Sequence, residues 1–189
     1  MLAIELRSAK ATAASCSGFV PALGLALDHA CSSARQAIDE LHRTVMDLYP
    51  SMLDDLGLIA SISFILREAR EAYPQLQVDA DISVSDNDVP SALRIVAFRI
   101  LQEAVNNVLK HADAHLLTVV FSAGTQHLSL VIADDGAGIP QSRMPRRRLS
   151  SGIIGMIRRV HDSGGAIEIT SSRGKGTRIG VEWNIAALC

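Results

Sequence analysis

The first part of the chain carries an apolar repeat with the spacing of a helix that packs along another helix. Small and apolar residues recur at alternating intervals of four and three, at Leu23, Leu27, Ala30, Ala34, Ala37 or Ile38, Leu41, Val45 and Leu48. A seam sustained over this many turns favours pairing with a partner helix over packing on the helix's own domain. Pro50 ends this helix, because the residue before a proline is pushed out of the helical region. We therefore predict a helical dimerisation segment at residues 1–50 and a second domain at residues 51–189.

The second domain alternates between helical and strand periodicity. Apolar residues at helical spacing predict helices over residues 51–73, from Pro90 to about His111, and from the region after Ser151 to about His161. Alternation predicts strands over residues 76–84, 116–121, 128–133, 166–170 and 178–185. Residues 138–151 show no periodicity and are predicted to be a mobile loop. Helices in one layer over a mixed, largely antiparallel sheet make a two-layer α+β sandwich.

Composition narrows the class of protein without identifying a site. The 189 residues are 48% apolar and 4% aromatic, which indicates a globular core of aliphatic side chains. With a net charge of −2, no broad polyanion-binding surface is implied, so nucleic acid is not an expected partner. No apolar stretch is long enough to span a bilayer. The chain is therefore expected to be cytoplasmic, and a longer, membrane-anchored parent protein stays open.

Three short runs in the second domain carry the candidate chemistry. Glu103 and Asn107 lie four residues apart in Gln102-Glu103-Ala104-Val105-Asn106-Asn107, so they share one face of a helix. In Asp134-Asp135-Gly136-Ala137-Gly138, the chain leaves a strand and bends so that its backbone can pass close to a planar ligand. The third run is Gly174-Lys175-Gly176-Thr177. A solvated helix face would explain the first run alone, and an Asp-Gly turn would explain the second.

Together, in this order and at these separations, the runs resemble the N, G1 and G3 boxes of the ATPase family shared by gyrase, Hsp90, MutL and the histidine kinases. The stretch from Phe98 to Ala112 resembles the N box of histidine kinases of the nitrate-sensor and DesK type. Residues 48–58 are similar to the segment that joins the dimerisation helices of those kinases to their catalytic domain, and residues 152–160 resemble their G2 box. The match runs from the Leu41 region to Ile185.

The resemblance implies a Bergerat ATP-binding fold with ATP and Mg²⁺ as cofactors. It implies that Asn107 is a ligand of the Mg²⁺ that bridges the phosphates, and that Glu103 is the catalytic carboxylate that polarises a water or the attacking group. Asp134 would accept a hydrogen bond from the exocyclic amine of adenine, while Asp135 points away. The other positions that it assigns to the nucleotide are Lys110, Gly136, Gly138, Gly152, Gly155, Gly174, Gly176 and Thr177. The loop at residues 138–151 occupies the place of the family's ATP lid.

The implied function is that of the catalytic domain of a two-component sensor histidine kinase. Such a domain transfers the γ-phosphoryl group of ATP to a histidine, for relay to the receiver domain of a response regulator. Residues 1–50 would hold part of the dimerisation domain, its second helix, and would make a homodimer. Two alternatives stay open, a kinase-inactive module that dimerises and binds nucleotide, and a serine kinase of the anti-sigma type.

The chain departs from these kinases at the phosphoacceptor. They carry the acceptor histidine on the first dimerisation helix, usually followed by an acidic residue, and no such pair is identified here. His42 is followed by Arg43, and its register to the linker places it on the second dimerisation helix. His161 precedes Asp162 but falls in the catalytic domain. Either the chain begins after the acceptor or it has lost self-phosphorylation, so we expect it to form no phosphohistidine on itself.

Overall fold

The computed structural model describes residues 29–30, 53, 55–139 and 150–187. Apart from His29 and Ala30, which are helical, these residues belong to one compact unit, Ser51–Cys189. The rest of the predicted dimerisation segment, its boundary at Pro50 and residues 140–149 of the predicted lid lie outside the described residues. The division into domains therefore stays a prediction.

The described strands form one five-stranded sheet in the order β1-β2-β3-β5-β4. Their bounds are Gln77–Ser83 for β1, Leu116–Ala123 for β2, His127–Asp134 for β3, Gly165–Ser171 for β4 and Thr177–Asn184 for β5. The pair β1–β2 is parallel, whereas β2–β3, β3–β5 and β4–β5 are antiparallel. Each predicted strand is present, and the sheet is mixed and largely antiparallel, as predicted.

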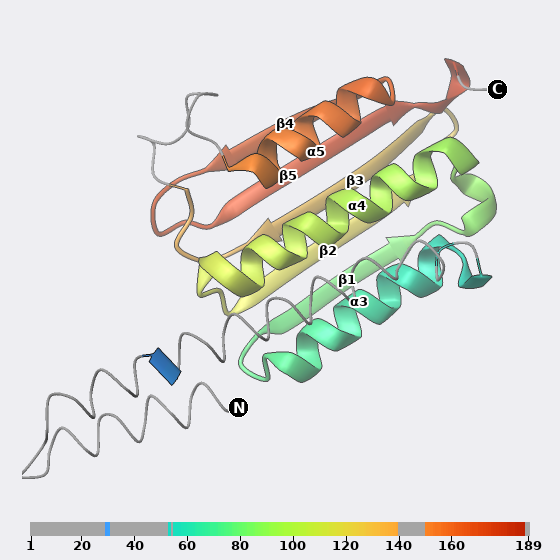
Figure 1. Cartoon of the computed structure of the whole chain (residues 1–189). Helices are drawn as coiled ribbons and strands as arrows, with labels where there is room; N and C mark the ends of the chain where they lie inside the picture. Colours follow the sequence, from blue (N-terminus) through green and yellow to red (C-terminus); the bar gives the residue numbers. More distant parts are fainter. Residues whose placement is uncertain (1–28, 31–52, 54, 140–149, 188–189) are drawn as a thin grey trace, which may run out of the picture. The chain divides into compact units, whose positions relative to one another are not determined.

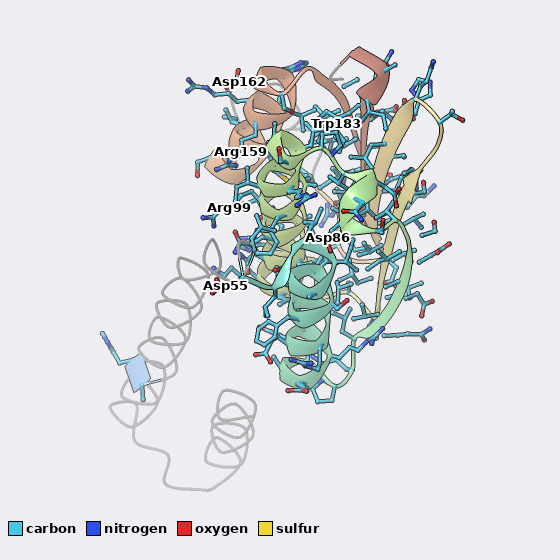
Figure 2. All side chains as sticks on the ribbon, turned by 90° about the vertical axis from the view of Figure 1, so that its right-hand side faces the viewer. Asp55, Asp86, Arg99, Arg159, Asp162 and Trp183 are labelled. Carbon is cyan, nitrogen blue, oxygen red and sulfur yellow. The ribbon has the colours of Figure 1, made fainter. Side chains whose placement is uncertain are left out.

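Helices α3 (Leu58–Ala72), α4 (Ser91–Asn107) and α5 (Ser151–Asp162) all cover the same face of the sheet (Figure 1). Seen from the side, the helices and the sheet form two separate layers (Figure 2). Leu128, Leu130 and Ile132 alternate along β3 and are buried between these layers, as a strand with one face on the core requires. The prediction of a two-layer α+β sandwich is confirmed. Among the described residues, no helix has both the length and the apolar character needed to cross a bilayer.

The prediction of one helix over residues 51–73 was wrong in one respect, because Gly57 interrupts the helix. Leu56 is helical, but Gly57 has a φ of 84°, and α3 begins at Leu58. The backbone N–H of Leu58 donates to Oδ1 of Asp86 at 2.5 Å, so a carboxylate distant in sequence caps the helix. A Cβ atom at residue 57 would lie 2.9 Å from both carboxylate oxygens of Asp86. Apolar spacing continues through the break, which is why the periodicity did not reveal it.

Helix α4 continues into a π-helical turn, η2 (Val108–Ala112), close to the predicted end at His111. Val108 and Ala112 are buried, and Asp113 ends the turn in the left-handed region with a φ of 50°. Single π-helical turns are rare and often occur at functional sites. This turn lies next to the cavity described below.

Candidate functional site

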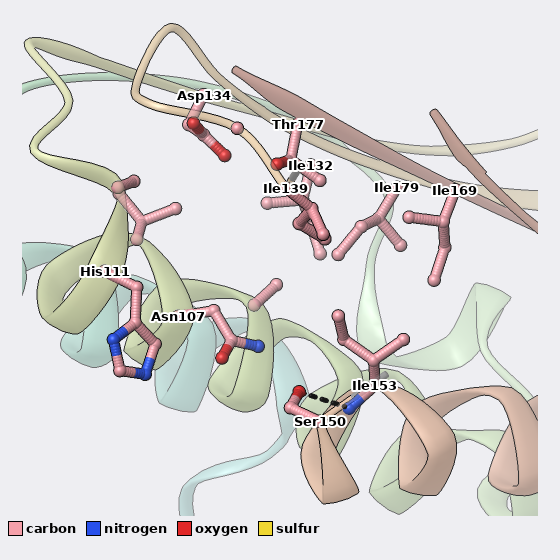
Figure 3. Close-up of a pocket in the computed structure, with 14 residues that line it drawn as sticks. Asn107, His111, Ile132, Asp134, Ile139, Ser150, Ile153, Ile169, Thr177 and Ile179 are labelled. Carbon is pink, nitrogen blue, oxygen red and sulfur yellow. Dashed lines mark hydrogen bonds between the residues drawn. The ribbon is translucent and has the colours of Figure 1, made fainter. Parts of the chain in front are cut away.

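A cavity of about 500 Å³ opens between α4, the start of α5 and the ends of β3 and β5 (Figure 3). Its apolar walls are built by Ala104, Val108, Ala112, Ile132, Ile139, Ile153, Ile169 and Ile179. Among the described residues, the polar side chains that line it are Asn107, His111, Asp134, Ser150 and Thr177. A largely apolar cavity with a small number of convergent polar groups is the usual form of a small-molecule site.

Asp134 is the acidic group on the cavity wall. It is the last residue of β3, and its Oδ1 accepts a hydrogen bond from the backbone N–H of Gly136 at 2.9 Å. Burial raises the pKa of the Asp134 carboxyl above its ordinary value, although backbone N–H groups of Gly136 and Thr177 offset part of that rise. Asn107 faces it from the α4 side of the cavity (Figure 3). A half-buried carboxylate of this kind distinguishes a ligand that donates a hydrogen bond from one that accepts it.

Asp135, the neighbouring carboxylate, serves the fold rather than the cavity. Its Oδ1 accepts hydrogen bonds from the backbone N–H groups of His115 and Leu116, both at 2.8 Å. The bond from Leu116 is the main reason that the pKa of Asp135 lies below its ordinary value. The two carboxylates therefore diverge, because Oδ1 of Asp134 bonds the N–H of Gly136 whereas Oδ1 of Asp135 bonds those of His115 and Leu116.

The two glycine runs beside Asp134 are bonded to each other through their backbones. The N–H of Gly176 donates to the carbonyl of Gly136, and the N–H of Gly174 donates to the carbonyl of Ala137, each at 2.8 Å. Gly176 is buried, has a φ of 75°, and would place a Cβ atom 1.8 Å from the carbonyl oxygen of Asp134. The close approach of these loops therefore fixes the end of β3 that carries Asp134.

Glu103 and Asn107 lie on one face of α4, as the spacing predicts. The Nδ2 of Asn107 donates to Oε1 of Glu103 at 3.3 Å. Asn107 lines the cavity, whereas Glu103 lies beyond its lining and against Gly152 of α5. The two side chains thus connect the cavity to the start of the next helix.

Known proteins share this sequence pattern. Residues 93–186 match the family described as histidine kinase-, DNA gyrase B-, and HSP90-like ATPase. The matched range contains all but the first two residues of α4, the elements η2, α5 and β2 to β5, and every residue discussed so far for the cavity. The chain belongs to the histidine kinase-like ATPase family.

Two curated relatives of the chain are histidine kinases. The chain is 33% identical over 143 residues to the signal transduction histidine-protein kinase/phosphatase UhpB of Salmonella typhimurium. The aligned segment covers 76% of this chain and 28% of that protein. It is 30% identical over 149 residues to the sensor histidine kinase LiaS of Bacillus subtilis, covering 79% of this chain and 40% of the relative. The chain thus spans less than half the length of either relative.

A solved structure shares the fold of this ATPase-family chain. The histidine kinase domain of the blue-light activated histidine kinase from Erythrobacter litoralis EL346 superposes with a TM-score of 0.65 at 17% identity. The alignment covers 97% of this chain and 94% of that domain. This chain therefore has the fold of that histidine kinase domain.

The fold of this ATPase-family chain gathers most, but not all, of the predicted site residues. Those that line the cavity are Asn107, Asp134, Gly138 and Thr177, and those in the loops beside it are Gly136, Gly174 and Gly176. Glu103 and Gly152 meet each other outside the lining. Lys110 and Gly155 do not line the cavity, so nothing here supports the assignment of these two to a nucleotide.

Two serines at or beside the cavity were not identified from the sequence. Ser150 lines the cavity and caps α5, since its Oγ accepts from the N–H of Ile153 at 3.4 Å. A serine directly before a helix is a recognisable capping signal. Ser171 Oγ accepts from the N–H of Ile139 at 2.7 Å and lies 2.9 Å from Oγ1 of Thr177. No sequence signal marks Ser171, because its partner Ile139 lies 32 residues away in the sequence.

Proposed function

We propose that the cavity binds Mg·ATP and that the domain transfers the γ-phosphoryl group to a histidine, for relay to an aspartate of a response regulator. The observation that carries this proposal is Asp134, a half-buried carboxylate on an apolar wall with Asn107 on the opposite side. The apolar wall with Asp134 suits a purine ring. Asn107 offers the oxygen ligand that a metal ion on the phosphate chain needs.

The apolar wall suits the faces of a purine, and Asp134 selects adenine. Ile132 on β3 and Ile179 on β5 line the cavity near the ends of their strands, where Asp134 and Thr177 also lie. Adenine presents an exocyclic amine, whose N–H donates to the carboxylate. Guanine presents a carbonyl at the corresponding ring position, and this acceptor would leave the half-buried carboxylate without a partner.

Asn107 is the proposed protein ligand of Mg²⁺. Its Nδ2 is engaged by Glu103, so the amide oxygen Oδ1 is the atom left to face a cation. Magnesium prefers hard oxygen ligands, keeps several waters and needs only one or two ligands from the protein. When bound, the ion neutralises charge on the phosphates.

Glu103 is the proposed general base. A neutral imidazole nitrogen of the acceptor histidine attacks the γ-phosphorus, a nitrogen–phosphorus bond forms, and the bond from the γ-phosphorus to its bridging oxygen breaks to release ADP. The proton on the other imidazole nitrogen passes to the carboxylate of Glu103. Transfer of this kind depends on positioning and charge neutralisation more than on covalent chemistry by the protein.

The choice of a histidine kinase rests on the relatives named above. Their similarity extends over 143 and 149 residues, more than the matched ATPase range of 93–186, so it includes sequence outside that range. By the same similarity we propose a receiver domain of a response regulator as partner, and a homodimer through residues 1–50. We also propose that the chain works in the cytoplasm, as part of a longer parent protein. An anchor that holds this parent protein at a membrane would be compatible with that role. No observation on the described residues favours the kinase-inactive module or the serine kinase.

Calorimetric titration with Mg·ATP and Mg·GTP tests the adenine site. Wild type should bind ATP more tightly than GTP, and Asp134→Ala should lose most of that preference. Asp135→Ala is the matched control, because this neighbouring carboxylate bonds His115 and Leu116 instead of facing the cavity. Equal ATP affinity in wild type and Asp134→Ala would remove Asp134 from the nucleotide site.

Phosphoryl transfer to a supplied acceptor helix tests the remaining assignments. Glu103→Ala should retain nucleotide and lose transfer, whereas Asn107→Ala should lose the magnesium dependence of nucleotide binding. An Asn107→Ala protein with unchanged magnesium dependence would remove that residue from the metal shell.

A further inference from the structure

The carboxylate of Glu103 occupies the space that a side chain at residue 152 would need. A Cβ atom built on Gly152 would lie 1.7 Å from Oε1 of Glu103 and 2.6 Å from its carboxyl carbon. The same Oε1 accepts the hydrogen bond from Nδ2 of Asn107. One oxygen of the proposed base is therefore held between an amide on its own helix and the bare Cα of a glycine on another helix.

We propose that Gly152 is a positioning residue that keeps the Glu103 carboxylate in register with Asn107. This inference rests on the proposed function, since it concerns the geometry of the proposed base. The two residues are far apart in sequence, and they meet because α4 and α5 pack side by side on the sheet (Figure 1).

Helix α5 is held in place, so a side chain at residue 152 must displace Glu103. Ile153 and Met156, on the same helix, are buried in the core between the layers. Moving the helix outward would expose these side chains to water, which is unfavourable. Glu103, in contrast, presents the end of a flexible side chain that can rotate away. Gly152→Ala should therefore move the carboxylate off Asn107 and leave the fold intact.

Thermal melting and the amide resonances of Asn107 test the contact independently of any activity. Gly155→Ala is the matched variant, because its Cβ would approach only the Arg159 guanidinium of its own helix, at 3.1 Å. Both variants should melt at or above the wild-type temperature, since alanine is the better helix former. Only Gly152→Ala should shift the Asn107 side-chain amide resonances, and toward their positions in Glu103→Ala. Unmoved resonances, or a melting temperature well below that of Gly155→Ala, would overturn the proposal.

Single-turnover transfer to the supplied acceptor helix gives the functional test. We expect Gly152→Ala to lower the transfer rate by about 10- to 100-fold, within the contribution of a positioned general base, and to change the affinity for Mg·ATP by less than about twofold. Ser151→Ala, at the adjacent exposed position of α5, should transfer like wild type. The double variant Gly152→Ala/Glu103→Ala should be no slower than Glu103→Ala alone, because the glycine acts only through that carboxylate.

The outcomes separate this inference from the proposed function. Wild-type protein that transfers no phosphoryl group, combined with the expected shift of the Asn107 resonances, would refute the kinase assignment and support the contact. Active wild type with an equally active Gly152→Ala would refute the positioning role and retain the kinase. A further loss in the double variant would show that Gly152 acts by another route, and would also overturn the inference.

Discussion

Replacing Gly176 by alanine should destabilise the domain much more than replacing Gly174, although the two glycines share one loop. Both adopt left-handed backbone conformations, with φ values of 75° and 73°. A Cβ atom at Gly174 would meet nothing within 4 Å, whereas at Gly176 it would lie 1.8 Å from the carbonyl oxygen of Asp134. Comparing the two alanine variants therefore separates the cost of backbone strain, which both share, from the cost of steric overlap, which only Gly176→Ala has.

The magnitudes follow from these two terms. A left-handed alanine costs about 1–2 kcal/mol in either position, and a lower entropy of the unfolded chain offsets roughly 0.4–1 kcal/mol of it. Overlap with a fixed backbone atom adds about 1–3 kcal/mol at Gly176 alone. Since about 1 kcal/mol shifts the melting temperature of a domain of this size by ~2–4 °C, Gly176→Ala should melt roughly 2–12 °C below Gly174→Ala.

Urea denaturation of the two variants, followed by circular dichroism, measures the difference in the free energy of unfolding without any ligand. The slopes should be alike, because the two variants expose the same surface on unfolding. Equal midpoints for Gly174→Ala and Gly176→Ala would show that the loop relaxes freely. The close approach to Asp134 would then not be what fixes the end of β3.

Three further changes have expected outcomes. The pKa of Asp134 is raised in the folded state, so the protonated carboxyl stabilises the fold at low pH, and this contribution is lost as the pH rises through the folded-state pKa. Asp134→Asn should abolish this loss of stability with rising pH and should melt at a higher temperature than wild type at neutral pH. In the same variant, ATP affinity measured by titration should no longer fall as acid protonates the carboxyl, a fall that begins in wild type above the usual aspartate range. Asp86→Ala removes the cap on Leu58 and should cost about 0.5–2 kcal/mol, with faster hydrogen exchange in the first turn of α3. Ser163→Ala leaves the indole N–H of the buried Trp183 without its 2.9 Å partner and should lower the free energy of unfolding by about 1–3 kcal/mol in urea.

The amino-acid sequence by itself determined the five strands, the order of the motifs and the family. Alternation along β3 and the apolar face of α4 predicted both elements, because burial on one side imposes the period of the backbone on the side chains. Glu103 and Asn107 could be paired from their spacing, since neighbours on one helix depend only on local geometry. That Asp135 points away from the ligand was implied by the resemblance to the ATPase family.

Only the tertiary structure decided the contacts between segments that are distant in the sequence. The start of α3 depends on Asp86, which a periodicity cannot reveal because the apolar spacing continues through Gly57. The contact of Gly152 with Glu103 requires α4 and α5 to lie side by side. The residue types in a sequence indicate which chemistry is available. The reason for a glycine at a given position becomes clear only when the atom that approaches it is known. That atom comes from another element, and its position is set by the packing of the whole layer.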